Sequence, residues 1–170
     1  AARALDYAHQ CGVVHRDIKP SNLLLDNESK LWVADFGLAT TAREADLTMT
    51  GDLLGTLRYM SPEQIRGERA VVDHRTDVYS LGVTLYEMLA LRPAFPMSDR
   101  HDLLRAVVSY DPVPLRKVNS SIPTDLETIV STAMQKEPAS RYQTAEALAA
   151  DLERFLDDRP IRARPPRSWE

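Results

Sequence analysis

The sequence has one cysteine, no long apolar run and no excess of basic charge. A lone cysteine, Cys11, excludes an internal disulfide and is typical of a reducing compartment. No apolar run approaches the roughly 18 residues of a membrane span, and no signal peptide opens the sequence. The net charge of -4 gives no basic footprint for nucleic acid. His9, His74 and His101 lack metal-ligand spacing and are expected at the surface. We therefore expect a cytoplasmic, weakly acidic protein with no nucleic-acid partner and no membrane segment in this sequence.

The 170 residues, 44% apolar and 27% charged, suffice for one domain or a large part of a bigger one. Val78, Leu81, Leu85 and Leu89 recur at helical spacing, and apolar neighbours widen the stripe. This pattern predicts a helix from Arg75 onward that is buried at the centre of a helical domain. Further helices are predicted at residues 1–10, 99–109, 124–135 and 144–156.

Short apolar runs between residues 13 and 34 predict the only strands. Val13-Val14 is expected to be one, and residues 23–25 and 31–34 are expected to pair as an antiparallel hairpin across the turn at residues 26–29. Residues 40–56 are polar and rich in threonine, without a clear period. They predict a long loop, and loops of this length inside a domain are usually functional.

Two polar clusters flank the predicted hairpin. His15-Arg16-Asp17-Ile18-Lys19-Pro20-Ser21-Asn22 precedes it and Asp35-Phe36-Gly37 follows it. Since a hairpin brings its ends together, the amide of Asn22 and the carboxylate of Asp35 are expected to converge, as suits Mg²⁺. Asp17 is close enough in sequence to orient a substrate hydroxyl there, and Lys19 adds positive charge where a transferring phosphoryl group gathers negative charge. This combination predicts phosphoryl transfer.

The order and spacing of these residues resemble the motifs of protein kinases. His15-Arg16-Asp17-x-Lys19-Pro20-x-Asn22 resembles the catalytic loop, and Asp35-Phe36-Gly37 resembles the metal-binding motif. Three later features are also similar to kinase motifs: the end of the activation segment in Gly55-Thr56-x-x-Tyr59-x-Ser61-Pro62-Glu63, the start of the central helix in Asp77-Val78-Tyr79-Ser80-Leu81-Gly82, and Arg141. The resemblance runs from residue 1 to about 157 and is closest to bacterial serine/threonine kinases of eukaryotic type.

The resemblance implies a role for each matching residue. Asp17 would steer the proton of the substrate hydroxyl. Asn22 and Asp35 would hold Mg²⁺ on the phosphates of ATP, and Lys19 would steady the γ-phosphate. Thr56 would lie near Asp17 and Lys19, and together with Lys19 it points to Ser/Thr substrates. Structural roles are implied for six residues: His15, Phe36, Gly37, Glu63, Asp77, which would anchor the catalytic-loop backbone, and Arg141, which would pair with Glu63.

The resemblance also implies regulation by phosphorylation. An arginine before the catalytic aspartate, here Arg16, marks kinases whose activation loop is ordered by a phosphothreonine, through charge-assisted hydrogen bonds. Thr48 and Thr50 stand at the offset of autophosphorylation sites in bacterial relatives. We therefore expect a protein substrate that presents Ser or Thr, together with autophosphorylation in trans at Thr48 or Thr50.

The implied fold is mostly α with a small β-hairpin region, the C-terminal lobe of a protein kinase without the N-terminal β-lobe. No G-x-G-x-x-G motif occurs, and the first predicted helix has no capping residue before it. The expected division is a partial kinase domain at 1–157 and a Pro/Arg-rich tail or linker at 158–170. We expect the chain alone to be weakly active or inactive, as part of a longer parent that is anchored to a membrane downstream of the tail or remains cytoplasmic.

Two other functions fit parts of the sequence. A non-catalytic docking or scaffold module could use the helical lobe, but it would have no need of Asp17, Lys19, Asn22 and Asp35. A small-molecule phosphotransferase would keep the metal ligands but would not need the segment 55–63 or Arg141. The sequence favours a serine/threonine protein kinase over both.

Overall fold

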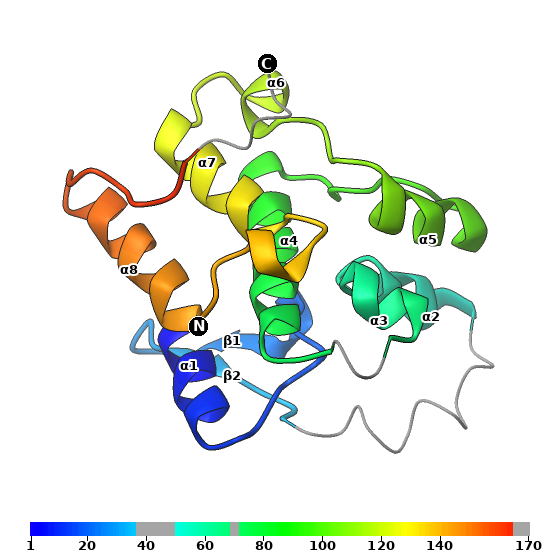
Figure 1. The fold of residues 1–170 in the computed structure, drawn as a ribbon, viewed down its shortest axis with the longest axis horizontal. Helices are drawn as coiled ribbons and strands as arrows, with labels where there is room; N and C mark the ends of the chain where they lie inside the picture. The colour runs from blue at the N-terminus through cyan, green and yellow to red at the C-terminus, as the bar shows by residue number, and fades with distance from the viewer. Residues whose placement is uncertain (37–49, 69–71, 165–170) are drawn as a thin grey trace.

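The computed structural model describes residues 1–36, 50–68 and 72–164, except for the side chains of residues 50–53. Helices dominate, together with one two-stranded sheet (Figure 1). In chain order the elements are α1 (Ala2–Gln10), the 3-10 turn η1 (Pro20–Asn22), β1 (Leu23–Leu25), β2 (Leu31–Val33), α2 (Thr50–Leu57), α3 (Pro62–Arg66), α4 (Arg75–Ala90), α5 (Arg100–Ser109), α6 (Leu115–Val118), α7 (Thr124–Ala133), the 3-10 turn η3 (Pro138–Ser140) and α8 (Ala145–Leu156). The predicted fold class, mostly α with a small hairpin, is confirmed.

Helix α4 runs through the middle of the molecule, with the other helices around it (Figure 1). It is apolar almost all round, so it packs on both sides, as the sequence predicts for a central helix. On one side Tyr79, Val83 and Tyr86 join a cluster with α5, α6 and α7. On the other side Val78 and Leu81 join a cluster with α1, α7 and α8. The helix is therefore the shared wall of two cores.

The close approach of α4 to α7 depends on a glycine. A Cβ atom on Gly82 would lie 2.8 Å from the Cβ of Ala133 and 3.0 Å from Cγ of Met134. Both neighbours are buried and belong to a packed interface, so neither can move aside cheaply. Gly82 therefore sets the distance between these two helices.

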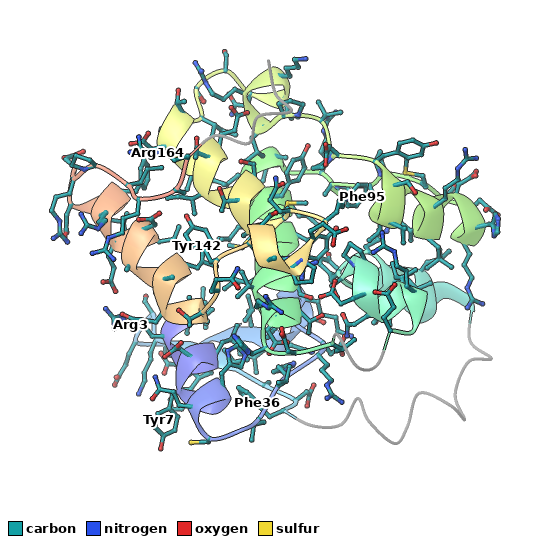
Figure 2. The ribbon with its side chains drawn as sticks, in the orientation of Figure 1. Arg3, Tyr7, Phe36, Phe95, Tyr142 and Arg164 are labelled. Atoms are coloured by element: carbon teal, nitrogen blue, oxygen red, sulfur yellow. The ribbon has the colours of Figure 1, made fainter. Side chains whose placement is uncertain are left out.

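Lys136, which follows α7, is partly buried against Phe95 and α5. Lys136 Nζ lies 4.6 Å from the ring centroid of Phe95, which is labelled in Figure 2, and donates to the carbonyl of Val107 at 2.8 Å. Burial disfavours the charged form and lowers the pKa of Lys136 to about 8. The cation–π contact and the carbonyl retain an ammonium group that its surroundings otherwise disfavour.

The hairpin β1–β2 lies at one edge of this helical body (Figure 1). Its strands pair antiparallel, with Leu24 opposite Trp32. Asp26 begins the turn between them: Oδ1 accepts from the amides of Glu28 and Lys30 at 2.9 Å each, and Oδ2 accepts from Trp32 Nε1 at 2.8 Å. Much of the hairpin's apolar surface is exposed, 51% of both Leu24 and Trp32. The pairing is as predicted, but the hairpin is buried on one side only.

The segment after α8 packs back onto the molecule. Ile161 and Ala163 contact the cluster shared by α1, α4 and α8. Asp151, 1% exposed, accepts from the backbone amides of Arg162 and Ala163 at 2.8 Å each and from the hydroxyl of Tyr142 at 3.0 Å. The chain up to Ala163 is thus held against α8, while the domain boundary at residue 157 stays a prediction.

Two local predictions are wrong. Val13-Val14 forms no strand, because no partner strand lies beside it in the described part of the chain. The predicted loop at 40–56 is helical from Thr50 on, as α2, while residues 40–49 lie outside the described residues. Leu54 and Leu57 pack into the cluster that contains α5. This tertiary packing stabilises a helix that the local sequence favours only weakly.

Candidate active site

A side chain at the start of α4 holds the backbone at residues 15 and 16 by hydrogen bonds. Asp77 is fully buried, and its carboxylate accepts from the amides of His15 at 2.8 Å and Arg16 at 2.7 Å. The loop needs this support because Arg16 has a φ of +66°, a left-handed conformation that is unfavourable for a residue with a side chain. The predicted contact between Asp77 and this backbone is present in the structure.

The side chains of Asp17 and Lys19, in the same loop, lie side by side. Lys19 Nζ is 3.1 Å from Asp17 Oδ2 and donates to Thr56 Oγ1 at 3.0 Å. The side chains of Asp17 and Lys19 are about a fifth exposed, at 21% and 22%. A carboxylate, an ammonium group and a hydroxyl, predicted from separate segments of the sequence, are therefore gathered at one accessible point.

Asn22 is oriented by its hydrogen bonds. Its side-chain Nδ2 donates to the backbone carbonyl of Asp17 at 2.8 Å and lies 3.5 Å from Asp17 Oδ2. Both partners are acceptors, so the NH₂ group must face Asp17 and the Oδ1 atom must point away from it. The residue is 4% exposed, so this orientation is firmly held.

Asp35 follows the hairpin's return strand, beside Asn22. The amide of Ala34 donates to the carbonyl of Asn22 at 2.9 Å, which brings the two ends of the hairpin together. Asp35 is exposed and has a φ of +62°. An amide oxygen and a carboxylate, with room for water and phosphate oxygens, form a donor set that fits Mg²⁺. Asn22 and Asp35 are therefore the residues that could hold the ion.

His15 joins the catalytic loop to the segment after β2. Its Nε2 atom lies 2.7 Å from the carbonyl of Ala34, and its Nδ1 atom accepts from the amide of Asp17 at 3.2 Å. Its ring meets Phe36 edge to face, with the centroids 4.7 Å apart; Figure 2 labels Phe36 on the hairpin side of the molecule. Gly37 lies outside the described residues.

A buried ion pair joins Glu63 of α3 to Arg141. Arg141 donates to both oxygens of Glu63 at 2.7 Å, and its other donors reach the carbonyls of Gln135, Lys136 and Arg75. All five N–H groups of the guanidinium are thus satisfied. Burial alone would raise the pKa of Glu63, but the hydrogen bonds and charge of Arg141 hold that pKa below its usual range. This pair fixes α3 against the loop before α8.

A groove of about 550 Å³ opens beside Lys19. Lys19 and Thr56 line one part of it, and Tyr59 and Glu87 line another. The hydroxyl of Tyr59 donates to Glu87 Oε2 at 2.7 Å, which fixes that wall. The groove therefore reaches Lys19, whose Nζ atom lies 3.1 Å from Asp17 Oδ2.

Sequence reasoning missed two residues that support the site. His9, expected at the surface, has a side chain only 7% exposed, and its Nε2 atom lies 2.8 Å from Asp77 Oδ2. Its position four residues after the fully buried Leu5 puts both on one face of α1, a signal that was available in the sequence. Gln64 donates from Nε2 to the carbonyl of Arg16 at 3.0 Å, and no local pattern marks that contact. Of the other two histidines, His101 is exposed, and His74 is partly buried.

The candidate phosphorylation sites fall at the margin of the described chain. Thr48 lies outside the described residues, and of Thr50 only the backbone is described, at the start of α2. The Arg16 Nε atom is buried and has no hydrogen-bond partner within the described part of the chain. The predicted pairing of Arg16 with a phosphothreonine stays a prediction.

This helical body, with a catalytic-loop aspartate, a lysine and a hairpin that carries an asparagine and an aspartate at its ends, belongs to a known class. The family model described as "Protein kinase domain" matches residues 1–152, and the chain belongs to the protein kinase family. It is 40% identical to the serine/threonine-protein kinase PknB of Mycobacterium leprae over 164 residues, 96% of this chain and 26% of that protein. The predicted resemblance to bacterial serine/threonine kinases is confirmed.

Other bacterial kinases show similar agreement. The chain is 38% identical to the probable serine/threonine-protein kinase CPE1738 of Clostridium perfringens over 159 residues, 92% of this chain and 23% of that protein. It is 39% identical to the probable serine/threonine-protein kinase SCO3848 of Streptomyces coelicolor over 163 residues, 95% of this chain and 24% of that protein. The chain spans about a quarter of the length of these curated relatives. Protein kinases use ATP and Mg²⁺ and act on proteins.

Within residues 1–36, 50–68 and 72–164, no helix has the length and apolar character that crossing a membrane requires.

Proposed function

We propose that this chain carries the catalytic loop and the substrate-binding side of a serine/threonine protein kinase, which transfers the γ-phosphate of ATP to protein Ser or Thr hydroxyls. The observation that carries the proposal is the meeting of Asp17, Lys19 and Thr56 within hydrogen-bonding distance at the mouth of a groove. Phosphoryl transfer depends mainly on positioning and on charge stabilisation, and these residues supply both.

In the proposed reaction, Asp17 accepts the proton of the substrate hydroxyl as its oxygen bonds to the γ-phosphorus and ADP leaves. Lys19 neutralises charge on the transferred group from 3.1 Å beside Asp17 Oδ2, while its bond to Thr56 keeps the ammonium group in place. Asn22 and Asp35 would hold Mg²⁺, and the ion would neutralise charge on the phosphates. The substrate segment lies in the groove beside Lys19.

The aspartate variant tests this mechanism. The full-length gene product that contains this chain is incubated with Mg-ATP and a Ser/Thr protein substrate, and phosphothreonine and phosphoserine are measured. Asp17→Asn keeps the shape and removes the base, and we expect kcat to fall by about a hundredfold or more. Activity that survives Asp17→Asn would disprove the assigned role. An absence of phosphotransfer, together with specific protein binding, would favour the scaffold function.

We also propose that the 170-residue chain alone is weakly active or inactive, because it contains no glycine-rich loop for the phosphates. The test compares its turnover with that of the full-length gene product under identical Mg-ATP concentrations. Turnover of the short chain that equals the full-length rate would contradict this proposal. A cytoplasmic site of action is proposed from the single, exposed cysteine and the need for ATP.

Regulation is proposed through Thr48, Thr50 and Arg16. A phosphate on either threonine would offer an acceptor to the buried Arg16 Nε atom, which lacks a hydrogen-bond partner in the part of the chain described. In trans, the active enzyme should phosphorylate the Asp17→Asn protein at one of these residues, as detected by mass spectrometry. Failure to label either threonine in that mixture would overturn the proposal.

A further inference from the structure

The residue before the proposed base is in a conformation that its surroundings must enforce. Arg16 has a φ of +66°, and the left-handed region costs a residue with a side chain roughly 1–2 kcal/mol. Such a conformation persists only where neighbouring groups determine it. The next residue is Asp17, so the direction of its carboxylate depends on how the Arg16 peptide groups are held.

Side chains from two helices hold the peptide groups on either side of Arg16. The amide of Arg16 donates to Asp77 Oδ1 from α4 at 2.7 Å, and its carbonyl accepts from Gln64 Nε2 of α3 at 3.0 Å. That carbonyl belongs to the same peptide plane as the amide of Asp17. Gln64 thus holds the carbonyl of the peptide group that joins Arg16 to Asp17, while the amide of the same group donates to His15 Nδ1 at 3.2 Å.

The direction of the Gln64 amide is set by a second pair of hydrogen bonds. Its Oε1 atom accepts from the amide of Ser61 at 3.0 Å and from Ser61 Oγ at 3.2 Å, as the third residue of a helix does in a capping box. With the oxygen committed to Ser61, the NH₂ group must face the carbonyl of Arg16. Ser61 is itself fully buried and hydrogen-bonded to Thr76, the neighbour of Asp77 in α4.

We infer that Gln64 is a positioning residue for Asp17: it fixes the strained Arg16–Asp17 peptide and ties the catalytic loop to the end of the activation segment. This inference rests on the proposed phosphoryl transfer and adds a residue to it. Gln64 does not touch the reacting atoms. It acts through the Arg16 carbonyl, so its loss should alter the alignment of the base and leave nucleotide binding unchanged.

Gln64→Glu separates the two contacts of this side chain. Glutamate can still accept from the amide of Ser61, and it is the usual residue at this position of a capping box, so α3 should stay intact. Its second oxygen, however, would face the carbonyl of Arg16 where a donor is needed. In the full-length gene product we expect kcat to fall by about ten- to a hundredfold, with KM for ATP within about twofold.

Gln143→Glu is the matched control. Gln143 Nε2 also donates to backbone carbonyls, those of Pro138, Ala139 and Arg141 at 3.2, 3.1 and 2.7 Å, far along the chain from Asp17. The same chemical change at this exposed residue should leave kcat unchanged. A kcat loss of equal size in both variants would overturn the inference, because it would reflect general destabilisation.

A pH profile gives a readout that a purely structural role would not move. In the Gln64→Glu variant, a protonated carboxyl can donate to the Arg16 carbonyl and accept from Ser61, as the native glutamine does. The ratio of wild-type to Gln64→Glu kcat should therefore shrink as the pH is lowered towards the pKa of a glutamate, about 4.3 in model peptides. A ratio that stays constant with pH would count against the inference.

Hydrogen exchange tests the same contact without activity. In the full-length gene product, Gln64→Glu should speed exchange of the amides of residues 15–17 and leave those of α4 unchanged. Unchanged exchange at residues 15–17 would overturn the inference even if the wild type proves inactive. An inactive wild type would instead overturn the proposed function, so the two failures are distinguishable.

Discussion

Two aspartates each accept three hydrogen bonds: Asp77 in α4, which supports the catalytic loop, and Asp26 in the turn of the neighbouring hairpin. Asp77 accepts from the amides of His15 and Arg16, and its Oδ2 atom also lies 2.8 Å from His9 Nε2, in a fully buried position. Asp26 accepts from Trp32 Nε1 and two amides at the exposed hairpin turn, and these bonds, that from Trp32 first, lower the pKa of its carboxyl. The contacts match in number and length, and only the surroundings differ.

Burial determines how much such hydrogen bonds contribute to stability. At the hairpin, water can replace any lost partner, whereas a donor left alone beneath the catalytic loop bears its full desolvation penalty. The same contrast separates two arginine pairs. Arg141 binds Glu63 with side chains 0% and 2% exposed, while Arg3, shown beside α8 in Figure 2, binds Glu153 with side chains 61% and 45% exposed. The irregular loop is thus more firmly fixed than the regular sheet next to it.

Replacing the buried arginine should have the largest effect. Arg141→Ala leaves the Glu63 carboxylate buried without its partner, and we expect the free energy of unfolding to fall by about 3–5 kcal/mol, measured by urea titration. Arg3→Ala, which removes an equally short but exposed pair, should leave the urea midpoint close to that of the parent. Equal losses in the two variants would abolish the comparison.

The two aspartates provide the second test. Asp77→Asn replaces one acceptor by an NH₂ group that faces other donors, and we expect a loss of about 2 kcal/mol in the free energy of unfolding. Asp26→Asn, the same change on the surface, should leave the melting temperature within about 2 °C of the parent. A large fall in both variants would mean that the hairpin turn is as firmly required as the loop anchor.

Lys136 tests the effect of burial through pH. Its pKa is lowered to about 8 in the folded chain from 10.5, so the unfolded chain binds more protons between these values. The stability should therefore rise as the pH increases from about 8 to about 9.5, by about 1–2 kcal/mol, in urea titrations at several pH values. Lys136→Met should remove this rise. A rise that persists in the variant would show that another group is responsible.

The comparison of the strained backbones of Arg16 and Leu91 has the smallest expected effect on stability. Leu91 ends α4 in the left-handed conformation, with a φ of +53°, and is 89% exposed, whereas the similar conformation of Arg16 is held by buried side chains. Leu91→Gly should raise the free energy of unfolding by about 0.5–1 kcal/mol, because the relief of strain exceeds the entropy cost of glycine. Leu91→Ala keeps the Cβ atom and should bring no gain. Differential scanning calorimetry would detect the difference as a shift in melting temperature.

The sequence predicts those parts of the molecule that repeating patterns specify. The spacing of Val78, Leu81, Leu85 and Leu89 predicts α4, and the turn at Asp26 predicts the hairpin, because periodicity and turn residues act locally. Helix α2 was missed because it depends on the packing of Leu54 and Leu57 against a distant segment.

For the site, the motif order predicts which side chains gather around Asp17, since their spacing serves one chemistry. Of the residues that support the catalytic loop, it predicts Asp77 but not Gln64 or His9. Gln64 contacts Arg16 across 48 residues, and His9 contacts Asp77 across 68 residues. The helical spacing from Leu5 indicates that His9 faces inward, but no local pattern identifies the partner of either residue. These contacts can be identified only in the folded structure.

The grip of Asp151 on the segment after α8 has a consequence for sequence variation. Asp151 holds the backbone amides of Arg162 and Ala163, not their side chains. These two hydrogen bonds therefore do not depend on the side chain at either position, although Ala163 also packs against the cluster of α1, α4 and α8. Proline is the exception, since it has no amide hydrogen to donate. Prolines occur on both sides, at Pro160 and Pro165, but at neither gripped position. A proline at position 162 or 163 would therefore remove one of the two hydrogen bonds that attach this segment to α8.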